Sequence, residues 1–409
     1  MDKKRIIFIA LFVVVSIGLG YLLYRIFFAS STPTTPDITP ITVGPDGTPI
    51  FPIAGETFDD EGNVITTQPD TLPTGRDTEL PSNLQTGSAA PQITQPIDAA
   101  ISGVHLSGSN VQFYNREDGL FYARDTQGNI KQLSDQVFFD VQDVTWSSKN
   151  NTAVLEYPDG ANIVYDFNTK KQVTLPKHWE DFSFSESGDK IAAKSLGLAT
   201  ENKWLVYTSA DGSQVNSIEP LGDNESKVIV DWSPNQQIVA FSRTGQALGA
   251  DREEILFVGL NGENYRSMIV EGRGFETQWS PTGKNLLYSV YSARSDYKPE
   301  LWIVGATPQT IGENRRLIGL NTWPDKCSFG SERFLYCAVP REMGIGAGMA
   351  KSITENTPDR LMQIDIQTGL KKNIPLDDVY LIKDIFVDEE TNILYFTDAY
   401  TDGLSQIAL

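Results

Sequence analysis

The sequence predicts an all-β fold made of repeated four-stranded units, and three observations support this prediction. Short apolar runs alternate with turn residues from residue 101 onward. A motif of an aromatic residue, a turn and an apolar run recurs seven times, with anchor residues 38 to 59 positions apart. The runs are apolar on both faces, which is typical of strands buried between neighbouring sheets.

The repeated motif is clearest in WSPTGKNLLYS, which starts at Trp279. Its residues Ser280 to Gly283 fit a type I turn, with Pro at the second position and Gly at the fourth. Because the aromatic residue before the turn buries a large area, we expect it to anchor one unit against the next. The expected anchors are Trp146, Phe184, Trp232, Trp279, Cys327 and Phe386, and a weaker first copy begins at His105.

Each unit continues beyond the motif with two more strands, as in ILFVGLNGENYRSMI, so that four antiparallel strands form a blade. Seven units predict a β-propeller of seven blades over residues 92–409, with six or eight blades as alternatives. The last unit ends one strand short, and we expect the segment Gln92 to Pro96 to supply that strand. Pairing of the two ends would remove an exposed sheet edge.

The turns resemble those of TolB-type propellers and of the N-terminal propellers in the prolyl oligopeptidase and type IV dipeptidyl peptidase families, which carry a WD-like aromatic-Ser-Pro-Asp-Gly turn. The matching positions are Trp232-Ser233-Pro234-Asn235 and Trp279-Ser280-Pro281-Thr282-Gly283. The resemblance covers residues 92 to 409 and implies a propeller, but a propeller fold alone does not specify a function. The sequence departs from the peptidases because no G-x-S-x-G nucleophile motif occurs in it.

The first 91 residues differ in composition from the repeats. Residues 6 to 24 form a run of 19 residues without a charge, preceded by Lys3, Lys4 and Arg5. This pattern predicts a cytoplasmic N-terminus at 1–5 and an uncleaved transmembrane signal-anchor helix at 6–28; a cleaved signal peptide is the alternative. Residues 30 to 100 hold 11 of the 22 prolines, which predicts a flexible, disordered linker at 29–91. The propeller is then expected outside the cytoplasm.

Composition argues against several classes of function. The formal net charge of -20 excludes a general nucleic-acid binder, which needs a basic surface. The two histidines, His105 and His178, lie in no metal or triad motif, and the glycines of MGIGAGM lack phosphate-loop spacing. We therefore assign no catalytic, cofactor-binding or metal-binding residues. Cys327 and Cys337 have the spacing for one bridge across a hairpin if their register allows it.

The connections between second and third strands are long and irregular, and they share one face of a propeller. They are expected at 196–202, 244–253, 292–298 and 340–360, and variable loops on a rigid scaffold commonly carry binding residues. The leading hypothesis is a membrane-anchored binding or scaffolding module of a bacterial cell envelope, which holds a protein or polymer. The alternative is an extracytoplasmic hydrolase or lyase that acts on cell-surface polymers through channel carboxylates. The candidate partner-binding residues are Arg243, Arg252, Arg294, Tyr297, Arg341 and Lys351.

Overall fold

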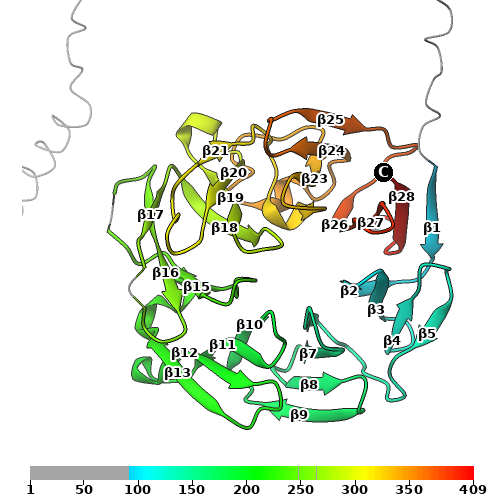
Figure 1. Ribbon diagram of the computed structural model, residues 1–409, viewed down its shortest axis with the longest axis horizontal. Coiled ribbons are helices and arrows are strands. Elements are labelled where there is room, and N and C mark those ends of the chain that lie inside the picture. The colour runs from blue at the N-terminus through cyan, green and yellow to red at the C-terminus, as the bar shows by residue number, and fades with distance from the viewer. Residues whose placement is uncertain (1–91, 247, 264) are drawn as a thin grey trace, which may run out of the picture. The chain divides into compact units, whose positions relative to one another are not determined.

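The computed structural model describes residues 92–246, 248–263 and 265–409. These residues form a ring of seven four-stranded antiparallel sheets, which confirms the predicted seven-bladed propeller (Figure 1). Residues 1–91, with the predicted membrane helix and linker, lie outside the described residues. Within the described part, no helix is long and apolar enough to cross a membrane.

Each blade runs from a strand at the centre of the ring to one at its periphery (Figure 1). Blade one consists of β2 (Ile101–Ser107), β3 (Asn110–Asn115), β4 (Leu120–Arg124) and β5 (Ile130–Gln132). Blade two consists of β6 (Asp143–Trp146), β7 (Thr152–Glu156), β8 (Asn162–Asp166) and β9 (Lys171–Leu175). Blade three consists of β10 (Trp179–Phe184), β11 (Lys190–Leu196), β12 (Lys203–Ser209) and β13 (Val215–Pro220). Blades four and five consist of β14 (Val228–Val230), β15 (Ile238–Ser242), β16 (Glu253–Gly259) and β17 (Met268–Val270); and β18 (Arg273–Trp279), β19 (Asn285–Tyr291), β20 (Glu300–Gly305) and β21 (Arg316–Leu317).

Blades six and seven complete the ring. They consist of β22 (Cys327–Phe329), β23 (Phe334–Pro340), β24 (Asp359–Asp365) and β25 (Lys371–Ile374); and β26 (Ile382–Asp388), β27 (Ile393–Asp398), β28 (Leu404–Ala408) and β1 (Ile93–Ile97). Short 3-10 turns lie in the connections: η1 (Thr200–Asn202), η2 (Gly222–Lys227), η3 (Ala293–Ser295), η4 (Pro324–Lys326) and η5 (Lys351–Thr354).

The ring closes by pairing its two ends. Strand β1 pairs with β28 in antiparallel register, with Ile93 opposite Ile407 and Ile97 opposite Leu404. This confirms the expected closure, although the strand extends one residue beyond Gln92 to Pro96. The edge of β28 is thereby covered, which removes a template for pairing with other chains.

The core lies between the blades rather than within any one of them. On β19 the consecutive residues Leu286, Leu287 and Tyr288 are all buried, so both faces of the strand pack against apolar neighbours. Leu287 belongs to the cluster shared with blade six, whereas Leu286 and Tyr288 pack toward blade four. The two-sided apolar pattern of the sequence therefore has the predicted structural cause.

The repeated turns also join neighbouring blades. Gly283 N–H donates to Ser280 O at 2.8 Å, which closes the predicted turn, and Asn285 N–H donates to Ser280 Oγ at 3.0 Å. Gly283 has φ +69° and lies against the corresponding turn of the preceding blade, where Asn235 Nδ2 donates to Gly283 O at 3.0 Å. A side chain at this position would meet Asn235. These turns are structural contacts between blades.

The expected anchors occupy two kinds of position. Trp146, Phe184 and Trp279 end the innermost strands of their blades, and Trp232 follows β14 by two residues. The indole of Trp279 donates to Asp231 O at 3.2 Å and that of Trp146 to Gly103 O at 2.7 Å, each in the preceding blade. Cys327 and Phe386 lie two residues before the ends of β22 and β26.

Candidate functional site

One face of the ring carries the connections between second and third strands and those between blades; we call it the loop face. The long connections between β11 and β12, β15 and β16, β19 and β20, and β23 and β24 lie where the sequence predicts them. The longest, residues 341–358 between β23 and β24, is called the β23–β24 loop below. The connections between blades, such as the one that contains η4, belong to the same face but are not part of the prediction from the sequence.

A cavity of about 760 Å³ opens among these connections and is called the loop-face cavity. Its walls come from the η4 connection, the β23–β24 loop, the start of β26 and the turn after β27. These segments belong to blades six and seven and to the connection that joins blades five and six. The lining residues are Trp323, Asp325, Lys326, Lys351, Thr354, Glu355, Asn356, Asp359, Leu381, Ile382, Lys383, Asp384, Ala399 and Tyr400.

A buried ion pair holds the walls of the loop-face cavity together. Lys326 Nζ lies 2.8 Å from both carboxylate oxygens of Asp359, whose side chain is 1% exposed. Ile382 N–H donates to Asp359 Oδ2 at 3.0 Å. Burial raises the pKa of Asp359, while the ammonium of Lys326 and the backbone N–H act in the opposite direction. The pair therefore joins the η4 connection, the start of β24 and the start of β26.

A second charged cluster fixes the β23–β24 loop over the ring. Lys351 Nζ lies 2.6 Å from Glu276 Oε2 and 2.6 Å from Asp325 Oδ2, and 5.5 Å from the ring centre of Trp323. We call Glu276, Asp325 and Trp323 the ammonium cage. Burial opposes the charge on Lys351, but Asp325 and Glu276 outweigh that effect and raise its pKa. Burial raises the pKa of Glu276, and the Lys351 ammonium acts against that shift.

Asp384 adds a further carboxylate to the loop-face cavity. It accepts a hydrogen bond of 2.8 Å from Thr397 Oγ1. Burial raises its pKa, and the negative charges of Asp325 and Asp143 add to the rise, whereas the Thr397 hydrogen bond and the Lys383 ammonium act against it. The neighbouring Lys383 points its ammonium at Asp402, 3.4 Å away. The cavity therefore contains more carboxylates than ammonium groups that are available to neutralise them.

A second cavity of about 440 Å³ is lined by residues of blades three to five. Asp181 and Asp231 line it with Glu276, and Lys194 Nζ lies 2.6 Å from Asp181 Oδ2. Burial raises the pKa of Asp231 to about 7, against a hydrogen bond from Thr277 Oγ1 at 3.0 Å. Burial and the nearby Asp143 also raise the pKa of Glu156 to about 7. Carboxylates therefore lie on the inner strands β6, β10 and β18 and directly after β14, toward the centre of the ring.

Bulges in the innermost strands accompany these carboxylates. The register of β10 shifts between Glu180 and Ser183, around Asp181, and that of β26 shifts between Ile382 and Ile385, around Asp384. The register of β18 shifts just before Glu276. Such bulges re-aim side chains and are frequent next to functional sites. A glycine inside β18, Gly274 at φ +67°, is the sequence signal that would have indicated this bulge.

The predicted partner-binding cations already contact their own chain. Arg243 pairs with Glu253 at 3.1 Å, Arg252 with Glu271 at 3.2 Å and Arg294 with Glu300 at 2.5 Å. Arg341 Nε donates to Asp359 O at 3.3 Å, and Lys351 lies in the ammonium cage. Tyr297 lies in the β19–β20 loop, where its carbonyl accepts a hydrogen bond from Gly348 N–H. Arg341 and Lys351 therefore lie in the β23–β24 loop, and Tyr297 contacts that loop. Arg243 and Arg252 lie on blade four.

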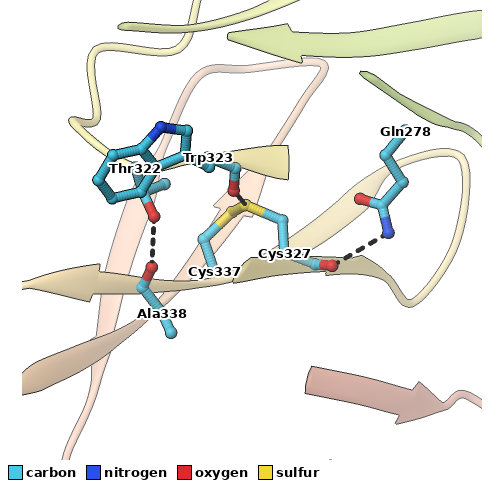
Figure 2. The surroundings of a disulfide bond; sticks show 6 residues. All are labelled: Gln278, Thr322, Trp323, Cys327, Cys337 and Ala338. Carbon is cyan, nitrogen blue, oxygen red and sulfur yellow. Dashed lines mark hydrogen bonds between the residues drawn. A yellow bond between two sulfur atoms is a disulfide. The ribbon is translucent and has the colours of Figure 1, made fainter. Parts of the chain in front are cut away.

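The disulfide lies directly beneath the ammonium cage. Cys327 and Cys337 are bonded and stand opposite each other in the register of β22 and β23. Cys327 Sγ lies 3.5 Å from Trp323 O, and Gln278 Nε2 donates to Cys327 O at 3.0 Å. Figure 2 shows both contacts beside the disulfide. Thr322 Oγ1 donates to Ala338 O at 2.6 Å on the other side of Trp323 (Figure 2). The bridge therefore fixes the backbone that presents Trp323 and Asp325.

Among the residues that the structure describes, no three His, Cys, Asp or Glu side chains are grouped so as to hold a metal ion. The two histidines lie apart: His105 stacks on Trp146, with ring centres 5.9 Å apart, and burial lowers its pKa to about 4. His178 lies in the connection between β9 and β10, where its carbonyl accepts a hydrogen bond from Leu196 N–H.

Comparison with known proteins supports the fold. No family model matches the chain, and no curated protein does either. Among solved structures, an oligogalacturonate lyase in complex with manganese has a TM-score of 0.54 at 15% identity, covering 79% of this chain and 94% of that one. Hydrazine synthase from Kuenenia stuttgartiensis has a TM-score of 0.51 at 10% identity, covering 79% and 98%. The β-propeller domain of Cps50 (Swd1) from Myceliophteria thermophila has a TM-score of 0.50 at 11% identity, covering 78% and 100%.

These likenesses show the fold and do not specify an activity, because propellers at such low identity share an architecture rather than a site. They agree, as far as the fold is concerned, with the resemblance of the turn motifs to those of TolB-type and peptidase propellers. Membership of the TolB-type group stays a prediction from the turn motifs. By its fold, the chain is similar to β-propeller proteins with widely different activities.

Proposed function

We propose that this chain is a binding module of the cell envelope, which captures a protein or polymer on its loop face. The single observation that carries the proposal is the loop-face cavity of about 760 Å³, walled by connections of two blades. Concave sites with a few convergent polar groups are the usual form of a binding site. The predicted N-terminal membrane helix and linker would hold the propeller outside the cytoplasm.

The rigidity of the cavity walls supports the binding hypothesis. The Lys326–Asp359 pair, the disulfide and the Lys351 cluster fix three of its walls. One large side chain on its rim is free to meet a partner, since Tyr400 is 83% exposed. Preorganised walls reduce the ordering cost of binding.

Crosslinking in intact cells tests this proposal. We expect Tyr400→Asp combined with Glu355→Lys to reduce the recovery of a specific crosslinked partner about tenfold, because both residues line the cavity. Leu370→Asp is the matched control, since Leu370 is 71% exposed in the turn between β24 and β25, on the opposite face. Equal recovery from all three proteins, with unchanged thermal unfolding, would contradict the proposal.

The predicted cations Arg294 and Arg341 are poor positions for a capture test, because both hold contacts within the chain. Reversing the charges of Arg294 and Arg341 would break the contacts with Glu300 and with the backbone of Asp359. Loss of capture in that variant would then mix a binding effect with a folding effect. Tyr400 and Glu355 avoid this problem because neither joins the ion pairs that hold the cavity walls.

A second candidate function is a hydrolase or lyase for cell-surface polymers. The observation in its favour is the proximity of Glu276 and Asp325, which each lie 2.6 Å from Lys351 Nζ and so within twice that distance of each other. Carboxylate pairs at comparable separations act in retaining glycosidases. The likeness to an oligogalacturonate lyase is compatible with this candidate. The ammonium of Lys351 occupies the space between the two carboxylates, however, and a substrate would have to displace it.

The enzymatic candidate has its own assay. Purified protein would be incubated with cell-wall polysaccharide and then assayed for new reducing ends or for the ultraviolet absorbance of an unsaturated product. Turnover that is lost in the Glu276→Gln variant would favour the enzyme. Absence of turnover with intact partner capture would favour the binding module.

A further inference from the structure

We propose that the ammonium cage is the specificity site of the loop face: it takes a primary ammonium group, the side chain of a lysine on a partner polypeptide. Lys351 is then a resident occupant, which the partner lysine displaces. This inference rests on the proposed binding function and names the chemistry of the partner. It concerns the cage residues Glu276, Asp325 and Trp323, and the β23–β24 loop that carries Lys351.

The geometry of the cage already fits an ammonium group. Two carboxylates each place an oxygen 2.6 Å from one Nζ, and the same Nζ lies 5.5 Å from the centre of the Trp323 ring. Carboxylates select a charged hydrogen-bond donor, and an indole face adds a cation–π attraction. A divalent metal ion gains nothing from the indole and prefers more oxygen ligands than the cage provides. The cage therefore favours an organic ammonium.

The walls of the cage belong to rigid elements, whereas its occupant lies on a long connection. Glu276 lies on β18, and Asp325 and Trp323 lie in the η4 segment that the disulfide holds. Lys351 begins η5, in the middle of the longest connection of the ring. Its side chain remains 40% exposed, so a competing ammonium has access to the same carboxylates.

The charge around the cage favours a cation over an anion. Glu276 and Asp325 share a single ammonium, and Asp384 faces the same cavity with its pKa raised partly by Asp325. Lys326 pairs with Asp359, while Lys383 and Arg116 share Asp402. The two cage carboxylates have one ammonium between them, so the charge at the cage itself is negative. A cationic partner would be attracted to it and an anionic one repelled.

The surface beside the cage favours a polypeptide over a small amine. Ile345, Met349 and Ile353 are three large apolar side chains exposed on the same β23–β24 loop. The loop rests on blade five through Gly346 N–H, which donates to Asp296 O at 2.9 Å, and Gly348 N–H, which donates to Tyr297 O at 2.8 Å. Apolar side chains next to a charged anchor fit a peptide that carries apolar residues on both sides of its lysine.

Chemical rescue gives the first test, with the full-length chain in detergent. Lys351→Ala removes three methylene groups and the ammonium, which n-propylammonium replaces atom for atom. We expect faster hydrogen exchange in residues 341–358 of this variant, and restored protection when n-propylammonium is added. Neutral 1-propanol and sodium chloride at matched ionic strength are the controls. Equal protection by 1-propanol, by sodium chloride or by calcium chloride overturns the assignment, and so does the absence of any protection.

A peptide titration gives the second test. The probe is the peptide acetyl-Ile-Lys-Ile-amide, and its control is the same peptide with an acetylated lysine side chain. We expect the lysine peptide to bind Lys351→Ala about tenfold more tightly than wild type, because no resident ammonium competes. Adding Glu276→Gln and Asp325→Asn to that variant should abolish the gain. Equal affinity for the two peptides, or a gain that survives the loss of both carboxylates, overturns the inference.

The two proposals fail in different ways. If lysine peptides bind the cage but Tyr400→Asp with Glu355→Lys leaves partner capture in cells unchanged, the cage inference stands and the proposed function fails. If partner capture depends on the cavity but the peptides do not bind, the loop face is a binding surface and the inference on its chemistry is wrong.

Discussion

Lys326 and Asp359 form a buried ion pair between segments 33 residues apart, with Nζ 2.8 Å from each carboxylate oxygen. Removing one partner leaves an uncompensated buried charge. We expect Lys326→Met to lower the free energy of unfolding by about 3 to 5 kcal/mol, measured by urea denaturation. The double variant Lys326→Met with Asp359→Leu should recover most of that loss, because it removes both charges.

An exposed pair provides the control for this prediction. Lys177 and Asp159 lie 2.7 Å apart with both side chains 64% exposed. Lys177→Met should lower the free energy of unfolding far less than Lys326→Met, since water screens the exposed pair. Similar losses for Lys326→Met and Lys177→Met would show that burial does not govern the contribution of the Lys326–Asp359 pair.

The disulfide gives a second prediction. Cys327 and Cys337 close a loop with a sequence separation of 10, and both are buried. We expect Cys327→Ala with Cys337→Ala to lower the free energy of unfolding by about 2 to 3 kcal/mol. A reducing agent should destabilise the wild type by a similar amount and leave the double variant unchanged. If the reducing agent also destabilised the double variant, its effect on the wild type would not come from this disulfide.

Trp279 gives a third prediction, on the contact between blades. Its ring stacks on Phe241 of blade four with centres 5.4 Å apart, and its indole N–H donates to Asp231 O. Trp279→Ala should cost about 3 to 5 kcal/mol through the cavity that it leaves. Trp279→Phe retains most of the packing, but it removes the donor of the hydrogen bond to Asp231 O. We expect this lost bond to lower the free energy of unfolding by about 1 kcal/mol, in addition to the loss from the smaller buried area.

An exposed aromatic residue is the matched control for Trp279. Phe139 is 70% exposed, and Phe139→Ala should change the free energy of unfolding by less than about 0.5 kcal/mol. Urea denaturation of the three variants under one set of conditions compares them directly. A Trp279→Ala loss as small as that of Phe139→Ala would show that the aromatic residue does not anchor the blade.

Local chemistry explains why the sequence predicts the blades well. The turn at Ser280 to Gly283 is recognisable because Pro, Gly and the hydroxyl group each act within a few residues. The ammonium cage is different: Glu276, Asp325 and Lys351 come from three connections or strands that only the closed ring brings together. The sequence predicts Lys351 as a partner-binding cation on a long loop. It does not show that Glu276 and Asp325 of the same chain pair with the Lys351 ammonium.

Closure of the ring gives a fourth prediction. Strand β1 covers the edge of β28, with Thr94 opposite Gln406. Deleting residues 93–97 should expose that edge, lower the temperature of unfolding and produce oligomers by strand pairing. Size-exclusion chromatography and calorimetry measure both effects. Deleting five residues from the proline-rich segment before residue 91 is the control, and equal behaviour of the two deletions would contradict the role of β1.

The carboxylates around the channel give a fifth prediction, on pH. Burial raises the pKa of Asp231 from 3.8 to about 7, so the folded protein binds a proton there that the unfolded chain releases. Stability from this group is therefore present below pH 3.8 and falls as the pH rises toward 7. Asp231→Asn removes the titration and keeps an acceptor for Thr277 Oγ1, so its stability should fall less than that of wild type over this range.

The difference between wild type and variant is the quantity to measure, because His105 acts in the opposite direction. Burial lowers the pKa of His105 from 6.5 to about 4, so its contribution rises with pH across the same range. Subtracting the pH profile of Asp231→Asn from that of wild type cancels the histidine and every other shared group. The difference in the free energy of unfolding, wild type minus Asp231→Asn, should decrease between pH 4 and pH 7. A remainder that is flat or rises with pH would show that burial does not raise the pKa of Asp231 in the folded protein.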